Sequence, residues 1–296
     1  MATFPTAVLI LLVVLVLIMA LLVSLRGASA RKRSRAPLRV LGGGAPGACY
    51  PPDLMKELLA VARRGRGYAP PTEKEHQGFC DAASRLSAKY KVAVPARALA
   101  SARQQERSLR ARNRTSNPQR WNEKLQADRR RGLSVVAIAA KHDLPPMFVL
   151  KALGPRGKVT EGEAHDAALT DSGSALHQRK TRARADDYET VVGAELDRLG
   201  VPHQTEEDLR EAGEQVTPDF LLGEPTEIQG RRVTWIDAKN YVYYGNRLTL
   251  PGLKKQARKY TAAFGPGAMV FAGGCACKVP PLGALLLGPD WAGELT

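Results

Sequence analysis

The chain begins with a continuous hydrophobic run from Ala7 to Leu25, in which Ser24 is the only polar residue. A run of this length nearly spans a hydrocarbon core of about 30 Å as a helix. Basic residues follow it, and by the positive-inside rule this predicts a single-pass anchor at 7–25 with the remaining chain in the cytosol. Two other interpretations of residues 1–30 stay open: a cleaved signal ending near Ala30, or a wrong start site.

The amino-terminal half beyond this run shows helical spacing of its apolar residues. A basic, glycine-containing linker is predicted at 31–52, followed by helices over 54–64 and 73–91. Two short apolar runs within 133–153 are separated by His142-Asp143-Leu144-Pro145-Pro146, which is typical of a helix-turn-helix. Residues 53–154 are therefore predicted to form an all-α, helix-turn-helix-like region that binds nucleic acid. A polar linker is expected at 155–185.

From residue 186 onwards the pattern becomes mixed. An amphipathic helix is predicted over 188–199, with Val191, Val192, Leu196 and Leu199 on its apolar face and Gly200 just past its end. Strands are predicted over 201–205, 219–222, 233–238 and 268–272, with a second helix over 251–264. This order predicts an α/β domain at 186–296, built on a mixed sheet flanked by helices.

Charge narrows the class of partner. The net charge is +15 and the pI is about 9.9, although the 44% hydrophobic and 25% charged residues are ordinary. Such an excess favours a polyanion, either nucleic acid or an anionic membrane surface. Residues 101–131 hold ten Lys or Arg against three acids. This run predicts a phosphate-contacting helix or arm, and the alternative is a solvated helix face.

The chain has four cysteines, Cys49, Cys80, Cys275 and Cys277. This is few for a disulfide framework in a chain of this length. The spacing of Cys275 and Cys277 differs from that of zinc knuckles. All four are therefore predicted to be reduced and structural, which indicates a reducing compartment.

Candidate chemistry lies on the predicted strands of the carboxy-terminal domain. Asp237 and Lys239 are two residues apart, so they point to the same face of a strand. Asp219 follows Pro218 at the start of the neighbouring strand. Carboxylates hold Mg²⁺, and a lysine beside them orients water or stabilises developing negative charge. An isolated Asp-x-Lys triplet would be a surface salt bridge, but the strand and the upstream Pro-Asp favour a metal centre.

A wider set of motifs resembles one family. The set consists of Tyr188-Glu189, Glu195, Thr217-Pro218-Asp219, Trp235-Ile236-Asp237-Ala238-Lys239, Gln256 with Tyr260, and Phe264-Gly265-Pro266-Gly267. In this order the chain resembles the TPD-motif branch of the PD-(D/E)XK nuclease superfamily. The resemblance implies a restriction-endonuclease-like fold and cleavage of DNA with Mg²⁺, for which Mn²⁺ substitutes. It also implies a codanin-1-like protein partner and a place in the nucleus or cytoplasm.

The resemblance assigns roles residue by residue. Asp219, Asp237 and Glu195 are expected to be catalytic and to hold the metal, with Glu189 as competitor for the helix carboxylate, and Lys239 is expected to be catalytic. Gln256 and Tyr260 are expected near the substrate. The basic face of the same predicted helix adds Lys255 and Arg258 as contacts to the DNA backbone. Asp237 replaces the Glu expected in this branch, and Tyr241 to Gly245 replaces an expected Phe-Gly-Asp.

Two functions follow from the sequence. The first is a Mg²⁺-dependent nuclease that hydrolyses phosphodiester bonds of DNA. The alternative is a non-catalytic DNA-binding or scaffold protein, with a silent nuclease fold that docks a partner. Glu206 stands between two interpretations as well, since it either assists a metal or belongs to a solvated edge.

Overall fold

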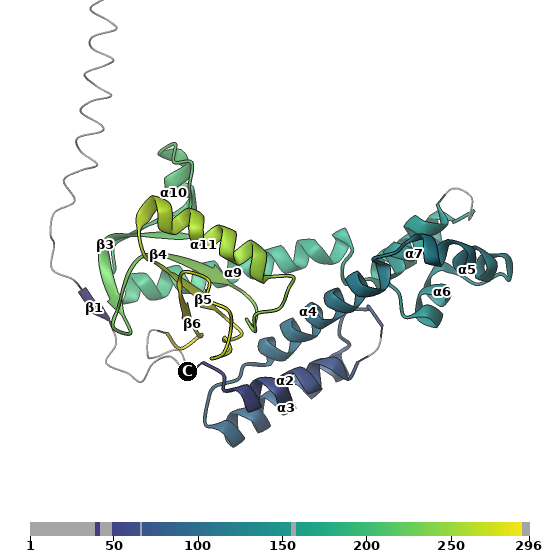
Figure 1. Ribbon diagram of the computed structural model, residues 1–296, viewed down its shortest axis with the longest axis horizontal. Helices are drawn as coiled ribbons and strands as arrows, with labels where there is room; N and C mark the ends of the chain where they lie inside the picture. Colours follow the sequence, from purple (N-terminus) through teal and green to yellow (C-terminus); the bar gives the residue numbers. More distant parts are fainter. Residues whose placement is uncertain (1–38, 42–48, 66, 155–157, 292–296) are drawn as a thin grey trace, which may run out of the picture. The chain divides into compact units, whose positions relative to one another are not determined.

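The protein is described by a computed structural model that covers residues 39–41, 49–65, 67–154 and 158–291 (Figure 1). The described residues from Arg39 onwards form one compact unit. This unit contains helical clusters in its amino-terminal half and a mixed sheet in its carboxy-terminal half.

Three helices form the first cluster: α2 (Pro52–Arg63), α3 (Glu73–Tyr90) and α4 (Ala96–Thr115). Leu54 and Leu58 of α2 pack with Phe79 of α3 and Leu99 of α4 in one hydrophobic core. A capping box begins α3, because Thr72 accepts from the backbone N–H of Glu75 while the Glu75 side chain accepts from that of Thr72. The two helices predicted over 54–64 and 73–91 are confirmed within a few residues.

Four shorter helices form the second cluster: α5 (Gln119–Arg130), α6 (Val135–His142), α7 (Pro146–Leu153) and α8 (Glu161–Thr170). The two predicted short helices are thus present as α6 and α7. Asp143 ends α6 in the left-handed region with φ 49°. Pro145 and Pro146 begin α7, since proline fits the first helical turn, where its missing N–H is not needed.

The sheet has six strands among the described residues. They are β1 (Arg39–Leu41), β2 (His203–Thr205), β3 (Phe220–Ile228), β4 (Arg231–Lys239), β5 (Ala268–Phe271) and β6 (Leu285–Leu287). The order is β1-β3-β4-β5-β6, and β2 pairs with β3. A tight hairpin at Gln229 and Gly230, with φ of 51° and 72°, makes β3 and β4 antiparallel, whereas β5 and β6 continue in parallel.

Helices cover both faces of this sheet (Figure 1). The long helix α9 (Ala175–Arg198) packs on one face of the sheet through residues such as Leu196. Helix α11 (Leu250–Phe264) packs on the other face through Leu253. Strand β5 shows the alternation, since Val270 faces α9 while Phe271 faces α11. The predicted mixed α/β sheet with flanking helices is confirmed.

Some sequence expectations need correction. Residues 155–185 were expected to be a linker, but they contain α8 and the first part of α9. Helix α8 is hard to recognise from hydrophobic spacing because Ala167 is its only buried residue. Val191 was expected on the apolar face of α9, yet it is 45% exposed. The expected linker at 31–52 contributes β1, and the pattern did not predict β6 or α10 (Glu206–Glu211).

The predicted membrane anchor is also corrected. Across the described ranges, no helix combines the length and the apolar character needed to cross a bilayer. Residues 7–25, on which the prediction rested, lie outside the described residues. The anchored localisation is therefore not retained.

The prediction that all four cysteines are reduced was wrong. Cys49 and Cys277 form a disulfide across 228 residues of sequence, with 4.9 Å between their Cα atoms. The neighbouring backbone brings them together. The backbone N–H of Tyr50 donates to the carbonyl of Cys275 at 2.7 Å, and the carbonyl of Tyr50 accepts from the N–H of Cys277 at 3.0 Å. Cysteine spacing cannot reveal a pair that meets only through the fold. The argument for a reducing compartment loses its basis.

We expect the disulfide to be measurable by thiol titration. In denaturant without reductant only two of the four cysteines, Cys80 and Cys275, should react with a thiol reagent, and all four should react after reduction. A Cys49→Ser/Cys277→Ser variant should unfold at lower denaturant, with a loss of about 2–4 kcal/mol. Four reactive thiols in the unreduced protein would rule the bond out.

Candidate functional site

Asp219 lies immediately before β3 and is held by the strand beside it. Its Oδ2 accepts a hydrogen bond of 2.7 Å from the backbone N–H of Ala238 in β4. Its carbonyl oxygen accepts from the N–H of Glu206 at 3.1 Å. Burial raises the pKa of the Asp219 carboxyl, and the positive charge of Lys239 opposes this shift. The predicted neighbours Asp219 and Asp237-Ala238-Lys239 are thus brought together.

Asp237 is completely buried on the face of β4 that α11 covers. Its Oδ1 accepts from Nε2 of Gln256 at 3.0 Å, and its Oδ2 forms an ion pair with Nζ of Lys239. No donor approaches Oδ2 with the geometry of a hydrogen bond. Lys239 therefore compensates the negative charge of Asp237 as an ion pair. Burial raises the pKa of Asp237 to about 7 despite Lys239.

Glu189, rather than Glu195, is the α9 carboxylate at this cluster. Burial raises the pKa of Glu189 to about 7, and repulsion from Asp219 adds to the shift. Glu195 instead forms a bidentate pair with Arg198, at 2.6 and 2.9 Å. Six helical residues rotate a side chain by roughly 600°, so Glu189 and Glu195 point in different directions. Glu195 is thus engaged with Arg198, and its competitor Glu189 is the α9 carboxylate near the other acids.

Helix α11 supports both acidic segments through Gln256 and Tyr260. Nε2 of Gln256 also donates to Oη of Tyr260 at 3.0 Å, and that hydroxyl donates to the carbonyl of Thr217 at 3.2 Å. Tyr260 is buried and packs edge-on against Trp235. Gln256 and Tyr260 therefore position Asp237 and the Pro218-Asp219 segment. The spacing of these two residues alone would also fit an exposed polar turn of a helix.

The Phe264-Gly265-Pro266-Gly267 motif has a structural explanation. Oγ1 of Thr234 lies within hydrogen-bond distance of the carbonyls of Phe264 and Pro266, to either of which it can donate, and Nε1 of Trp235 donates to that of Gly265. A Cβ on Gly267 would lie 2.1 Å from the indole of Trp235, so only glycine fits there. This motif fixes the turn between α11 and β5 against β4.

A groove of about 520 Å³ borders the acidic cluster. It is lined by Lys239, Tyr241, Leu248, Thr249, Gly252, Leu253, Lys255, Gln256, Lys259 and Tyr260. Lys255, which was predicted to contact the DNA backbone, is one of the lining residues, and that contact stays a prediction. Arg258 is exposed on the same helix but is not part of the lining, and Lys259 takes the position one turn beyond Lys255.

Glu206 belongs to the surroundings of the cluster. Its Oε1 accepts from Oγ1 of Thr217 at 3.2 Å and from Arg210 at 2.6 Å. Its negative charge also contributes to the raised pKa values of Asp219 and Glu189. The Thr205-x-x-Asp208 capping box could have placed Glu206 here, because it begins α10 directly after β2, which pairs with β3.

The carboxylates of the cluster are of the ligand type that Mg²⁺ prefers in proteins. Within the described part of the chain, no group of three or more His, Cys, Asp and Glu side chains is arranged to hold a metal ion. Mg²⁺, however, often takes one or two carboxylates and several waters. Asp219 and Asp237 supply two carboxylates to the cluster, and the buried Oδ2 of Asp237 lacks a directed donor.

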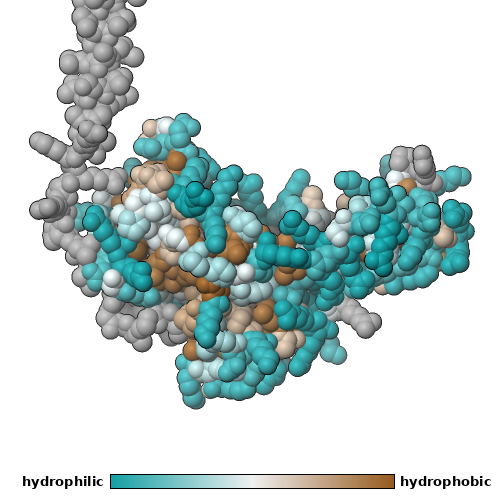
Figure 2. All heavy atoms as spheres, in the orientation of Figure 1, coloured by the Kyte–Doolittle hydropathy of each residue, from teal (hydrophilic) through white to brown (hydrophobic). Residues whose placement is uncertain are grey.

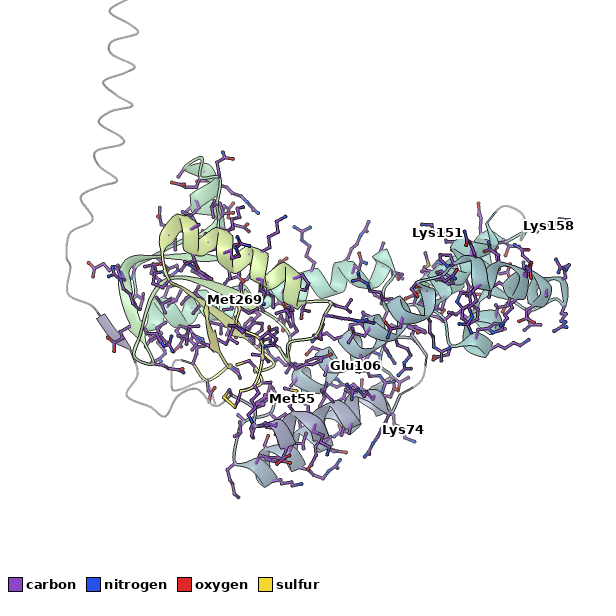
Figure 3. All side chains as sticks on the ribbon, viewed as in Figure 1. Met55, Lys74, Glu106, Lys151, Lys158 and Met269 are labelled. Carbon is purple, nitrogen blue, oxygen red and sulfur yellow. A yellow bond between two sulfur atoms is a disulfide. The ribbon has the colours of Figure 1, made fainter. Side chains whose placement is uncertain are left out.

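The basic side chains of the helical half differ in whether an acidic side chain pairs with them. Several arginines of 101–131 are held by acids: Arg103 by Glu75, Arg110 and Arg114 by Asp143, Arg129 by Glu163 and Arg131 by Asp128. Helix α7 buries Val149 and Leu153, and its one cation is the exposed Lys151 (Figure 3). The visible surface over α5, α6 and α7 is mostly hydrophilic (Figure 2). DNA contact by this half stays a prediction.

The chain resembles one protein family and one viral protein. Residues 158–280 match the family model described as "Protein of unknown function TPD sequence-motif". The matched segment includes Glu189, Asp219, Asp237 and Gln256. The chain is also 40% identical over 100 residues to "Uncharacterized protein L539" of Acanthamoeba polyphaga mimivirus. That alignment spans 32% of this chain and 36% of the viral protein. No solved structure matches the chain.

The raised carboxyl pKa values predict a stability that depends on pH. Asp237 and Glu189 have folded pKa values of about 7, above the roughly 4 of an unfolded chain. Between these values the folded protein binds more protons, so the free energy of unfolding should rise as pH falls from about 8 to about 5. Denaturant unfolding at both pH values, in EDTA, measures this.

An Asp237→Asn/Glu189→Gln variant is the control. The variant should be more stable than the wild type at pH 8. Its free energy of unfolding should also change much less between pH 5 and pH 8 than that of the wild type. A variant less stable than the wild type at pH 8 would show that Lys239 outweighs the cost of burying the charge.

Proposed function

We propose that this protein is a metal-dependent nuclease of the PD-(D/E)XK type that hydrolyses phosphodiester bonds of DNA. The observation that carries the proposal is the cluster of Asp219, Asp237 and Glu189 around Lys239, next to a groove with Lys255 and Lys259. Buried or half-buried acids that repel each other favour a bound cation, and the groove lysines favour a polyanion.

Each residue has a task in this proposal. Asp219 and Asp237 would hold Mg²⁺, with Mn²⁺ as a substitute. The bound ion supplies charge relief at the phosphate and lowers the pKa of a bound water. Gln256 and Tyr260 keep the two acidic segments in place through their hydrogen bonds. Lys239 offers a proton donor to a phosphate oxygen, and the carboxyl of Glu189, with a pKa near 7, is suited to accept a proton from water.

The fold and the family are consistent with this assignment. The TPD segment contains all the acids of the cluster, and helices flank a mixed sheet as a restriction-endonuclease-like fold requires. A codanin-1-like partner rests on the resemblance alone.

The alternative is a non-catalytic DNA-binding protein. The lack of a preformed three-ligand group among the described residues favours it, together with the net charge of +15. In that case Asp237 would be a structural ion-pair partner of Lys239.

Two matched variants test the proposed roles. Glu189→Gln should lower the rate of Mg²⁺-dependent DNA cleavage by roughly a hundredfold or more, because it removes the proton acceptor. Glu195→Gln makes the same chemical change on the same helix, away from the cluster, and should stay within about threefold of the wild type after correction for the folded fraction. Cleavage of labelled single-stranded, duplex and branched DNA gives the rates.

Asp237→Asn decides between the two functions. Mg²⁺-dependent cleavage by the wild type that disappears in this variant, with DNA binding retained, supports the nuclease. Equal cleavage by both proteins points to a contaminating enzyme and sinks the assignment. Salt-dependent DNA binding without cleavage supports the alternative.

A further inference from the structure

We propose that α4, which lies outside the TPD segment, shapes the substrate groove, and that Gln105 is a positioning residue for substrate binding. The inference rests on the proposed nuclease function, since it assigns a substrate to the groove. Its subject is the connection of residues 240–249 between β4 and α11. Tyr241, Leu248 and Thr249 of this connection form one side of the groove.

Side chains of α4 hold the backbone of this connection as a neighbouring strand would. Nε2 of Gln105 donates to the carbonyl of Val242 at 2.9 Å, and the N–H of Val242 donates to Oγ of Ser101 at 3.0 Å. Both backbone groups of Val242 are therefore satisfied by α4. Val242 is fully buried and packs in the hydrophobic cluster of α2, α3 and α4.

The attachment continues two and four residues further on. Oη of Tyr244 donates to Oε1 of Glu106 at 3.0 Å, and Nδ2 of Asn246 donates to Oε1 of Gln105 (Figure 3 labels Glu106). The positions 242, 244 and 246 alternate as in an extended strand, which explains why all three face α4.

The opposite edge of the connection is held by the carboxy-terminal segment. The backbone N–H of Tyr243 donates to the carbonyl of Gly274 at 2.9 Å, and the carbonyl of Tyr243 accepts from the N–H of Ala276 at 2.8 Å. A Cβ on Gly273 would lie 2.5 Å from the backbone N of Val242, so the two backbones are in close contact. The hydrogen bonds at this edge are between backbone groups, whereas those at the α4 edge come from side chains of α4, so a substitution in α4 can release that edge.

Asn246 carries this attachment to the groove. Its Oδ1 accepts from the N–H groups of Leu248 at 2.9 Å and Thr249 at 3.2 Å, immediately before α11. Gln105 thus holds the side chain that orders two groove-lining residues. The family match covers residues 158–280, whereas α4 spans Ala96–Thr115. The groove therefore needs a part of the chain that the family segment does not contain.

Limited proteolysis of the full-length protein tests the attachment without any reference to catalysis. Arg247 is exposed in the connection and is a site for trypsin. Gln105→Ala should speed cleavage after Arg247 by about fivefold or more, because local opening becomes easier. The control is Gln77→Ala, which removes an exposed glutamine of α3 bonded only within its own helix to Asp81 at 3.0 Å, and it should cleave like the wild type.

Kinetics test the role in the groove. Gln105→Ala should raise KM for DNA by about tenfold with kcat within about threefold, since the groove side is displaced while the acids stay in place. General destabilisation would instead lower kcat through the folded fraction and leave KM unchanged. Asn246→Ala should have a similar effect, and the double variant should raise KM no more than the larger single effect, as expected for a pair in contact.

An unchanged KM, or unchanged cleavage after Arg247, in Gln105→Ala overturns the proposal. If the wild-type protein hydrolyses no DNA under any condition, the proposed function fails. The trypsin comparison with Gln77→Ala then still decides whether Gln105 holds the connection.

Discussion

The burial of the Asp237 carboxylate is the constraint around which the carboxy-terminal half is organised. A charge in the interior is costly unless it is paired and hydrogen-bonded. Lys239 provides the pair and Gln256 the hydrogen bond, from β4 and α11 respectively. Even so, the pKa of Asp237 lies near 7, so the charge is incompletely compensated. A site in this state is suited to a cation, and this links the stability of the fold to its proposed chemistry.

The same constraint explains why Gln256 and Tyr260 are spaced one helical turn apart. Gln256 bonds Asp237 and Tyr260, and Tyr260 bonds Thr217, so a single face of α11 ties β4 to the segment before β3. The acids of two strands are thereby held in register.

The amino-terminal helices and the carboxy-terminal end meet at one short stretch of chain. Tyr50 pairs with the backbone around Cys275 to Cys277, and the disulfide from Cys49 closes the same contact. Beside it, α4 holds the connection that follows β4. The helical half therefore contributes structure to the half that contains the sheet and the acidic cluster.

The sequence by itself determined the main helices and strands, the mixed sheet, and the convergence of Asp219, Asp237 and Lys239, because strand alternation and hydrophobic spacing are local. It could not choose between Glu189 and Glu195, since the direction in which α9 lies across the sheet selects the face that meets the acids. It also could not find the Cys49–Cys277 bond or the contact of Gln105 with Val242. Those partners are separated by more than a hundred residues. Only the packing of the folded chain brings them into reach.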